Sequence, residues 1–196
     1  VASILDPRYT FSVSKKQTAA GSADAINHIM EQYFCGEHTE LTDGFCESAI
    51  KSIIRNATIA LKEPNNYDAR SELMVNCSLA CNGILSIGNS PSGWPCHGME
   101  HALSAYYDIT HGEGLAILTP RWMEHILNEN TIERFVSFGT HIFGIDETLD
   151  ANEIAQKTIQ ATYQMFEGFG IPMHLKDVGI DESRLSEMAH HIAVNE

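Results

Sequence analysis

Apolar residues recur at helical spacing along most of the chain, with few interruptions by glycine or proline. In one periodic segment the residues of a single helix face recur at intervals of four: Leu73, Cys77, Cys81 and Leu85. Thr42 is a suitable N-cap for a predicted helix that runs to Leu61. The pattern predicts helices over 18–34, 42–61, 69–87, 97–106, a stretch that begins near 111, 132–138, 151–166 and 182–193.

Alternating patterns typical of strands are nearly absent, and only residues 1–5 and 10–13 show one. We therefore expect a mostly α fold, a bundle of several helices that occupies residues 1–196 as one domain. The strand-like opening resembles the continuation of an upstream segment, and the chain closes inside a helical pattern. We expect both ends to be cut rather than natural.

Charge and composition exclude several classes of function. Twelve Lys and Arg stand against 26 Asp and Glu, a net charge of −14, so the chain lacks the basic face that nucleic-acid binding requires. No apolar run is long enough to cross a bilayer, and the first residues do not form a signal peptide. Five cysteines, an odd number, are placed like core residues. We expect a soluble, cytoplasmic protein that binds neither nucleic acid nor membrane.

Two pairs of potential metal ligands have the spacing that puts both members on one helix face. His97 and His101 lie four residues apart, and His111 opens the next predicted helix. Asp24 and His28 repeat the spacing on the first predicted helix. Helical bundles build metal sites from such pairs on facing helices, and imidazole with carboxylate suits Fe(II) or Zn(II).

Other interpretations of these residues stay open. The sequence His97-Gly98-Met99-Glu100-His101 also matches the H-x-x-E-H pattern of zinc metalloproteases, in which both histidines bind zinc and the glutamate activates water. That interpretation leaves Asp24, His28 and His111 without a role. A helical metal-binding domain with no catalysis of its own is a further alternative. Six other histidines have no such company and are expected to be structural or solvated: His38, His125, His141, His174, His190 and His191.

Three stretches resemble the iron-containing (group III) alcohol dehydrogenase family, and its butanol dehydrogenase-like, aldehyde-reducing branch in particular. They are residues 16–28, 97–123 and 169–172. The resemblance covers essentially the whole chain. It implies the α-helical C-terminal domain of the dehydroquinate synthase-like, iron-containing alcohol dehydrogenase fold.

Residue by residue, the resemblance places the family's metal ligands on Asp24, His28, His97 and His111. It makes His101 the histidine beside the metal, near nicotinamide and substrate, where it would relay the alcohol proton or only orient the site. Two further observations concern pocket and core. Trp94 either lines the substrate pocket or simply packs, and Cys77 and Cys81 are expected to be core residues rather than ligands.

The activity that the resemblance implies is NAD(P)H-dependent interconversion of primary alcohols and aldehydes by an oxidoreductase with Fe(2+) or Zn(2+). The intact enzyme is expected to be a homo-oligomer. The sequence contains no Gly-rich turn after a strand, the feature that holds a dinucleotide. The resemblance thus implies that the N-terminal dinucleotide-binding domain is absent from this chain, and that residues 1–196 alone are inactive.

Overall fold

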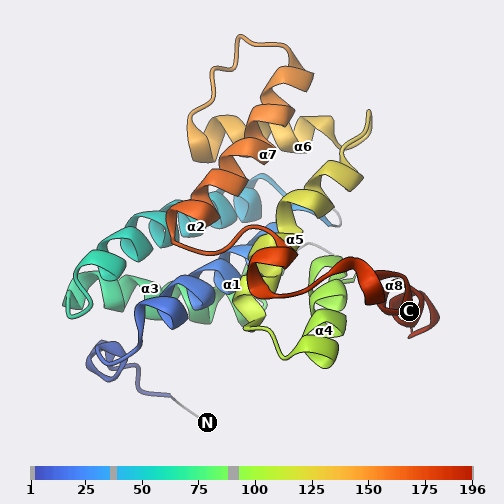
Figure 1. The fold of residues 1–196 in the computed structure, drawn as a ribbon. Coiled ribbons are helices and arrows are strands. Elements are labelled where there is room, and N and C mark those ends of the chain that lie inside the picture. The colour runs from blue at the N-terminus through green and yellow to red at the C-terminus, as the bar shows by residue number, and fades with distance from the viewer. Residues whose placement is uncertain (1–2, 36–38, 88–92, 196) are drawn as a thin grey trace. The chain divides into compact units, whose positions relative to one another are not determined.

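The computed structural model describes residues 3–35, 39–87 and 93–195, and every regular element within those ranges is helical. The chain divides into two compact units, residues 1–92 and 93–196. Figure 1 shows the helices in chain order. The mostly α fold predicted from the periodicity is confirmed.

Three long helices, which pack against one another pairwise, form the first unit. They are α1 (Lys15–Phe34), α2 (Glu40–Lys62) and α3 (Tyr67–Cys81). Two short 3-10 helices flank them, η1 (Pro7–Thr10) and η2 (Ile84–Ser86). The centre of this unit contains fully buried aliphatic side chains such as Ile26, Ile50 and Ile53.

Side-chain caps set the starts of these helices. Ser14 accepts a hydrogen bond from the backbone N–H of Gln17 at α1, and Thr39 accepts one from the N–H of Thr42 at α2. The predicted N-cap of α2 was therefore wrong by one turn. Thr39 and Thr42 have the same chemistry, and the extended backbone at Thr39 (φ −124°, ψ 140°) makes it the cap.

The third helix is shorter than its periodicity predicts. It ends at Cys81, and Gly83 adopts a left-handed conformation (φ +82°) that glycine tolerates better than other residues. Leu85 consequently lies in η2 rather than on the helix. Leu85 is nevertheless buried, so the apolar position that the periodicity marked is a core position although the helix has ended.

The strands predicted at 1–5 and 10–13 are not present in the part of these segments that the structure describes. Residues 3–6 have no regular structure, and residues 1–2 lie outside the described residues. Pro7–Thr10 is a 3-10 helix, capped by Asp6, whose side chain accepts a hydrogen bond from the N–H of Arg8. A local cap satisfied the backbone here in place of a neighbouring strand.

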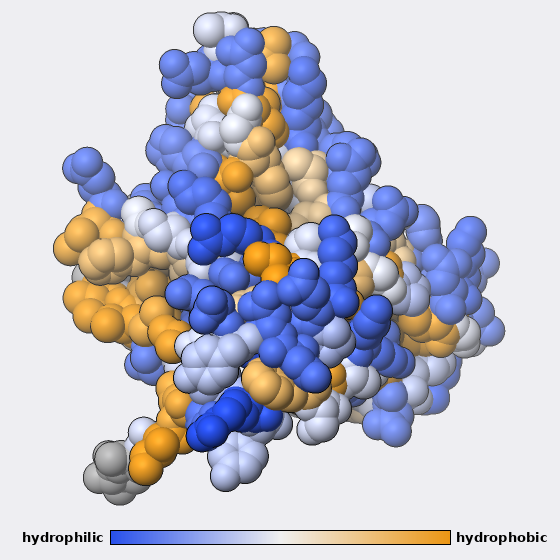
Figure 2. Space-filling model, turned by 90° about the vertical axis from the view of Figure 1, so that its left-hand side faces the viewer, coloured by the Kyte–Doolittle hydropathy of each residue, from blue (hydrophilic) through white to orange (hydrophobic). Residues whose placement is uncertain are grey.

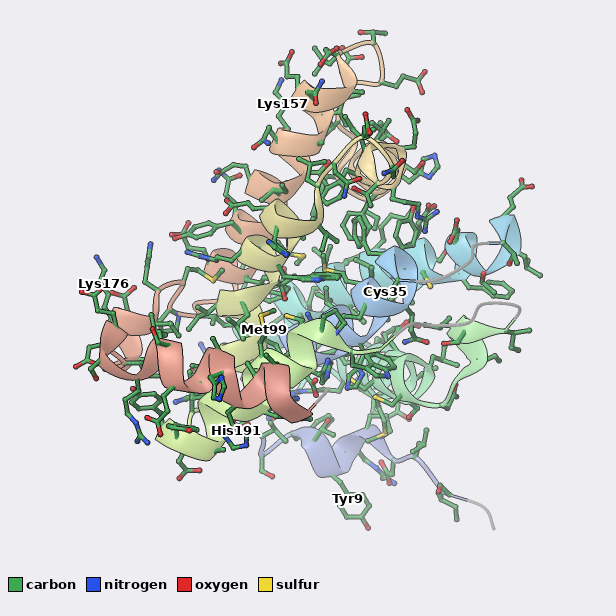
Figure 3. The ribbon with its side chains drawn as sticks, turned by 90° about the vertical axis from the view of Figure 1, so that its right-hand side faces the viewer. Tyr9, Cys35, Met99, Lys157, Lys176 and His191 are labelled. Atoms are coloured by element: carbon green, nitrogen blue, oxygen red, sulfur yellow. The ribbon has the colours of Figure 1, made fainter. Side chains whose placement is uncertain are left out.

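The second unit contains the remaining helices. They are α4 (Pro95–Tyr107), α5 (His111–Ile126), α6 (Ile132–Phe138), α7 (Ala151–Gly168) and α8 (Leu185–Asn195), with a π-helical turn over Gly139–Phe143 and 3-10 turns over Leu175–Val178 and Glu182–Arg184. Helix α4 packs against α5 and α8, and α7 packs against α5 and α6. Figure 3 shows α8, which carries His191, alongside α4, which carries Met99.

A tight turn joins α4 to α5 and determines where α5 begins. Asp108 closes α4 in a left-handed conformation (φ +50°), and its N–H donates to the carbonyl of Ser104. Thr110 is the N-cap residue of α5, so His111 is the first residue of that helix. The turn therefore returns the chain along α4 with a histidine at its leading end.

The described surface is mainly polar. Figure 2 shows one face of the molecule, on which hydrophilic side chains predominate and hydrophobic side chains gather in separate patches. Strongly exposed apolar residues include Ile4, Tyr9, Leu41 and Ile87. Among the helices of the described residues, none is long and apolar enough to span a membrane.

Arg70 connects the three parts of the first unit that lie around the start of α3. Its guanidinium donates to the carbonyl of Pro64 (2.9 Å), the hydroxyl of Thr18 on α1 (2.9 Å) and the carbonyl of Val13 (3.5 Å). The side chain is buried, and this burial lowers its pKa. Because all three acceptors are neutral, Arg70 acts here through directed hydrogen bonds rather than through an ion pair.

We predict that Arg70→Ala lowers the free energy of unfolding by about 2–4 kcal/mol, since it removes these bonds and leaves the acceptors unpaired. Urea denaturation followed by circular dichroism measures the change. Arg55→Ala, at an exposed position of α2, is the matched control and should stay within about 0.5 kcal/mol of the original protein. Equal stability of the two variants would contradict the role of Arg70.

Candidate metal centre

Helix α4 places four polar side chains at intervals of three and four residues: His97, Glu100, His101 and Ser104. His97 is buried and 6% exposed, whereas His101 is exposed. Pro95 occupies the start of the helix, where its missing N–H costs nothing. The predicted pairing of His97 and His101 on one helix is confirmed, with ring centroids 6.2 Å apart.

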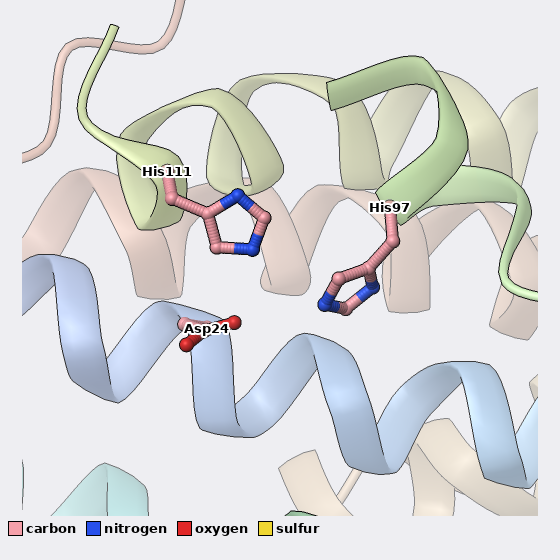
Figure 4. A group of neighbouring side chains, drawn as sticks. All are labelled: Asp24, His97 and His111. Carbon is pink, nitrogen blue, oxygen red and sulfur yellow. The ribbon is translucent and has the colours of Figure 1, made fainter. Parts of the chain in front are cut away.

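His111 at the start of α5 lies beside both of these histidines. Its ring centroid is 5.3 Å from that of His97 and 5.6 Å from that of His101, on which it stacks with an angle of 25° between the planes. Figure 4 shows the rings of His97 and His111 turned toward each other, each presenting a nitrogen to the space between them. The second unit thus brings three imidazoles into one cluster.

Glu100 lies on the buried side of this cluster. Its side chain is fully buried, one carboxylate oxygen accepts a hydrogen bond from the hydroxyl of Ser104 (2.5 Å), and the other contacts Nδ1 of His111. A buried carboxylate is costly unless each oxygen is hydrogen-bonded. Both oxygens of Glu100 have such a partner.

A glycine on α5 makes room for that carboxylate. A Cβ placed on Gly114 would lie 2.8 Å from Cγ and 2.8 Å from Oε1 of Glu100, closer than real side chains approach. Glycine inside a helix costs up to about 1 kcal/mol relative to alanine. The close approach of the Glu100 side chain to α5 explains why glycine is present at this position.

The first unit carries the other predicted pair. Asp24 and His28 lie one turn apart on α1, and Nε2 of His28 is 3.4 Å from Oδ1 of Asp24. Figure 4 also draws Asp24 on its helix. The carboxylate and imidazole of this pair therefore share one face of α1, as their spacing predicts.

The donor atoms of the second unit fit a divalent transition metal. Ligand atoms of Glu100, His101 and His111 lie within 4.8 Å of one another. Imidazole nitrogens and carboxylate oxygens suit Fe(II) and Zn(II). The facing nitrogens of His97 and His111 are the second possible arrangement, and it leaves Glu100 to hold a histidine instead of an ion.

Trp94 contacts the cluster through His97. Its ring lies 5.5 Å from that of His97 in an edge-on arrangement of 79°, and 40% of the residue is exposed. An exposed indole beside a ligand-bearing helix has a face available for an apolar substrate. Trp94 therefore both packs against His97 and exposes part of its ring, so it fits the substrate-pocket role and the packing role alike.

Cys77 and Cys81 have the properties of unligated thiols. Burial raises the pKa of Cys77 to about 11, with a smaller contribution from the charge of Asp24, and burial also raises the pKa of Cys81. Metal-binding cysteines are thiolates, which need a lowered pKa. This agrees with the expectation that neither is a metal ligand. The expectation that both are core residues is wrong for Cys81, which is exposed where α3 ends, and Cys77 is only half-buried.

The six remaining histidines do not belong to the metal-ligating groups found among the described residues. His38 lies outside the described residues. His174 is paired with Asp177 at 3.2 Å on the surface, and His191 packs its ring against Tyr106. For the histidines that the structure describes, this placement fits the structural or solvated roles expected of them.

Sequence reasoning did not identify Ser104 and Gly114, and it gave Glu100 only the role of a protease glutamate. The spacing of 100 and 104 was visible, because residues four apart share a helix face. The contact of Glu100 with His111 and Gly114 depends on how α5 packs on α4, which the sequence does not state.

Comparison with known proteins identifies relatives over nearly the whole chain. The profile of the C-terminal part of the Fe-containing alcohol dehydrogenase family matches residues 18–196. NADH-dependent butanol dehydrogenase A of Clostridium acetobutylicum is 50% identical over 194 residues, which cover 98% of this chain and 50% of that protein. NADPH-dependent aldehyde reductase YqhD of Escherichia coli is 34% identical over 187 residues, 94% of this chain and 47% of that protein.

Solved structures show the same relationship. The crystal structure of NADH-dependent butanol dehydrogenase A from Thermotoga maritima matches with a TM-score of 0.91 and 35% identity, over 96% of this chain and 47% of that one. The chain spans about half the length of the relatives it matches. The family resemblance seen in the sequence is confirmed.

Because the pKa of Cys77 is raised, we predict that its thiol reacts slowly with alkylating reagents. At pH 8 a thiol of pKa about 11 holds about 100-fold less thiolate than one of pKa 9, so iodoacetamide should label Cys77 correspondingly slowly and faster as pH rises. Mass spectrometry of timed samples measures this, with the exposed Cys81 as internal comparison. Labelling of Cys77 at the rate of a free thiol, or protection of either cysteine by added zinc, would contradict the assignment.

Proposed function

Because this chain belongs to the iron-containing alcohol dehydrogenase family, we propose that the protein interconverts primary alcohols and aldehydes with NAD(P)H and a bound divalent metal. The observation that carries the proposal is the buried His97 facing His111 at the head of the next helix. Because two relatives are named butanol dehydrogenases, we propose butanol and similar short primary alcohols, with their aldehydes, as the substrates.

The proposed metal ligands are Asp24, His28, His97 and His111. Support comes from two pairs, each within one unit: the carboxylate and imidazole of α1, 3.4 Å apart, and the rings on α4 and α5, with centroids 5.3 Å apart. The family resemblance assigns both pairs to one ion. Three imidazoles and one carboxylate form a donor set suited to iron(II) or zinc.

A metal ion at such a site supplies Lewis-acid polarisation of an alcohol or carbonyl oxygen. The residues of the chain supply the rest. Burial of His97 limits the movement of its ring and keeps its environment poor in water. Glu100 contacts Nδ1 of His111 and so holds that ring through one of its two nitrogens. Trp94 offers an apolar surface next to His97 for the hydrocarbon part of the substrate.

His101 is the proposed proton-transfer residue. It is exposed and stacks on His111 at 5.6 Å, so it has access both to the proposed site and to solvent. Imidazole titrates near neutral pH, which suits the transfer of the alcohol proton to bulk water. The same position would also place His101 beside the nicotinamide, as the resemblance implies.

The names of the relatives favour NADH over NADPH as the cofactor. Four relatives, 36–50% identical, are named NADH-dependent butanol dehydrogenases, two of them as probable, whereas the aldehyde reductase is named NADPH-dependent. We therefore propose NADH for the whole protein. The cytoplasmic location, expected from the composition and the first residues, and the homo-oligomeric state, expected for the intact enzyme, stay predictions.

The protease alternative receives less support from the site. A glutamate that activates water needs an oxygen directed at solvent, but Glu100 is fully buried and both of its oxygens contact protein groups, Ser104 and His111. The non-catalytic alternative is distinguished by activity of the whole protein. The protease alternative also leaves the pair on α1 without a role, whereas a non-catalytic metal-binding domain would use it.

The ligand assignment predicts one metal ion per chain, and substitution of His97 or His28 by alanine should reduce metal content to well below one. Inductively coupled plasma mass spectrometry of the purified variants measures this. His125→Ala, at an exposed position of α5, removes a histidine outside the cluster and should leave the content unchanged. One full equivalent of metal in both His97→Ala and His28→Ala would refute the assignment.

His101→Gln tests the proton-transfer role. In the whole protein, we expect metal content to remain at one ion per chain while kcat for aldehyde reduction falls about 100-fold, the loss typical of a missing general acid. An unchanged kcat at unchanged metal content would show that His101 at most orients the site.

A further inference from the structure

We propose that Glu100 is a positioning residue for His111, fixing the proton of that imidazole on Nδ1 so that Nε2 is free to bind the metal. The inference rests on the proposed function, because it assigns His111 to a metal. It gives a role to Glu100, which the proposed ligand set leaves out and which the H-x-x-E-H pattern would make a water-activating glutamate.

An ionised carboxylate only accepts hydrogen bonds. One oxygen of Glu100 accepts from the Ser104 hydroxyl at 2.5 Å, and the other contacts Nδ1 of His111. The contact is satisfied when Nδ1 carries the proton, and a neutral imidazole then has its lone pair on Nε2. Carboxylates that hold metal-binding histidines in this way orient the ring and make it a stronger ligand.

The direction of the ring agrees with this assignment. Nδ1 is the nitrogen that meets Glu100. In Figure 4 the other nitrogen of His111 points toward His97, whose ring is 5.3 Å away between centroids. The two nitrogens of His111 therefore have separate roles: Nδ1 contacts Glu100, and Nε2 is available to the proposed metal.

Two neighbours hold Glu100 in place. Ser104, one turn along α4, donates its single hydroxyl proton to Oε1 at 2.5 Å, and the same hydroxyl lies 3.3 Å from the carbonyl oxygen of Ile109. Gly114 leaves the space that the carboxylate occupies, since a Cβ there would lie 2.8 Å from Oε1. Because the glutamate is enclosed by Ser104, His111 and Gly114, it has a single position from which to orient the imidazole.

Direct ligation by Glu100 is the competing interpretation. Its oxygen lies within 4.8 Å of ligand atoms of His101 and His111. An ion there would take an oxygen that already contacts Nδ1 of His111 or Ser104. We therefore assign Glu100 to His111, and the tests below separate the two roles.

The first test needs no substitution in the protein measured. Nitrogen-15 NMR of the histidine-labelled, zinc-loaded protein reports which nitrogen of His111 is protonated, with assignment from a His111→Gln sample. We expect a slowly exchanging proton on Nδ1 and none on Nε2. A proton on Nε2, or zinc bound through Nδ1, would overturn the proposal.

The second test measures zinc affinity by competition with a chromophoric chelator. Glu100→Gln should weaken binding about tenfold, and Gly114→Ala should weaken it in the same direction although Glu100 remains, with losses of 10- to 100-fold typical of groups that hold a ligand. Glu124→Gln, on the exposed face of α5, and Gly168→Ala, where an added Cβ meets nothing within 4 Å, are matched controls.

The outcomes separate this inference from the proposed function. If the unsubstituted protein binds no zinc, iron or other divalent metal, the proposed function fails, while the NMR measurement on the metal-free protein still decides whether Glu100 sets the tautomer of His111. If metal binds and depends on His97 and His111, but Glu100→Gln and Gly114→Ala bind zinc as tightly as their controls, the proposed function stands and the inference fails. Circular dichroism of the metal-free variants excludes unfolding as the cause of a lost affinity, and a variant that does not fold leaves the NMR result decisive.

Discussion

The enclosure of one carboxylate determines how α4 and α5 meet in the second unit. Glu100 is fully buried, and a buried charge is tolerated only where hydrogen bonds replace water. Its partners come from both helices, the Ser104 hydroxyl on α4 and the His111 imidazole on α5. Gly114 allows the approach. The register of α5 on α4, and with it the position of His111 beside His97, depends on this contact.

The turn before α5 makes the arrangement possible. The left-handed residue Asp108 ends α4, and Thr110 then starts α5 so that His111 stands in its first turn. A histidine one residue later would face another side of the helix. Backbone geometry at Asp108 and side-chain satisfaction at Glu100 therefore act on the same imidazole, one by placing it and the other by orienting it. This is how a helical unit prepares a ligand before any metal binds.

The sequence predicted the helices well, because the apolar period is a property of local spacing. It was wrong where a single local contact decides the result: the cap at Thr39 and the end of α3 at Gly83. It was also wrong in the opening segment, where strands were expected at 1–5 and 10–13, whereas residues 3–6 have no regular structure and Pro7–Thr10 is a 3-10 helix. Strands require a partner segment, and an alternating pattern does not reveal whether one exists. Helix boundaries are also set by one hydrogen bond or one φ angle rather than by the whole pattern.

For the candidate site, too, local spacing was predictable from the sequence and contacts between helices were not. Spacing alone identified His97, His101 and the pair on α1, since residues four apart share a face. The contact of Glu100 with α5 required the packing of two helices, which no spacing within one helix encodes. Gly114 was the available signal, a glycine inside a helical pattern that has a packing reason. The family resemblance selected the ligands among the histidines, but it did not identify the residue that holds one of them.

Anomalous diffraction from crystals of the metal-loaded protein, collected on both sides of the iron and zinc absorption edges, tests the central claim most directly. The account predicts one anomalous peak at about 2.0–2.2 Å from Nε2 of His97 and of His111, with Asp24 and His28 as the other protein ligands. It also predicts that Glu100 remains hydrogen-bonded to Nδ1 of His111. A peak bonded to Glu100 and His101, or a metal-loaded crystal with no peak beside His97, would contradict the account.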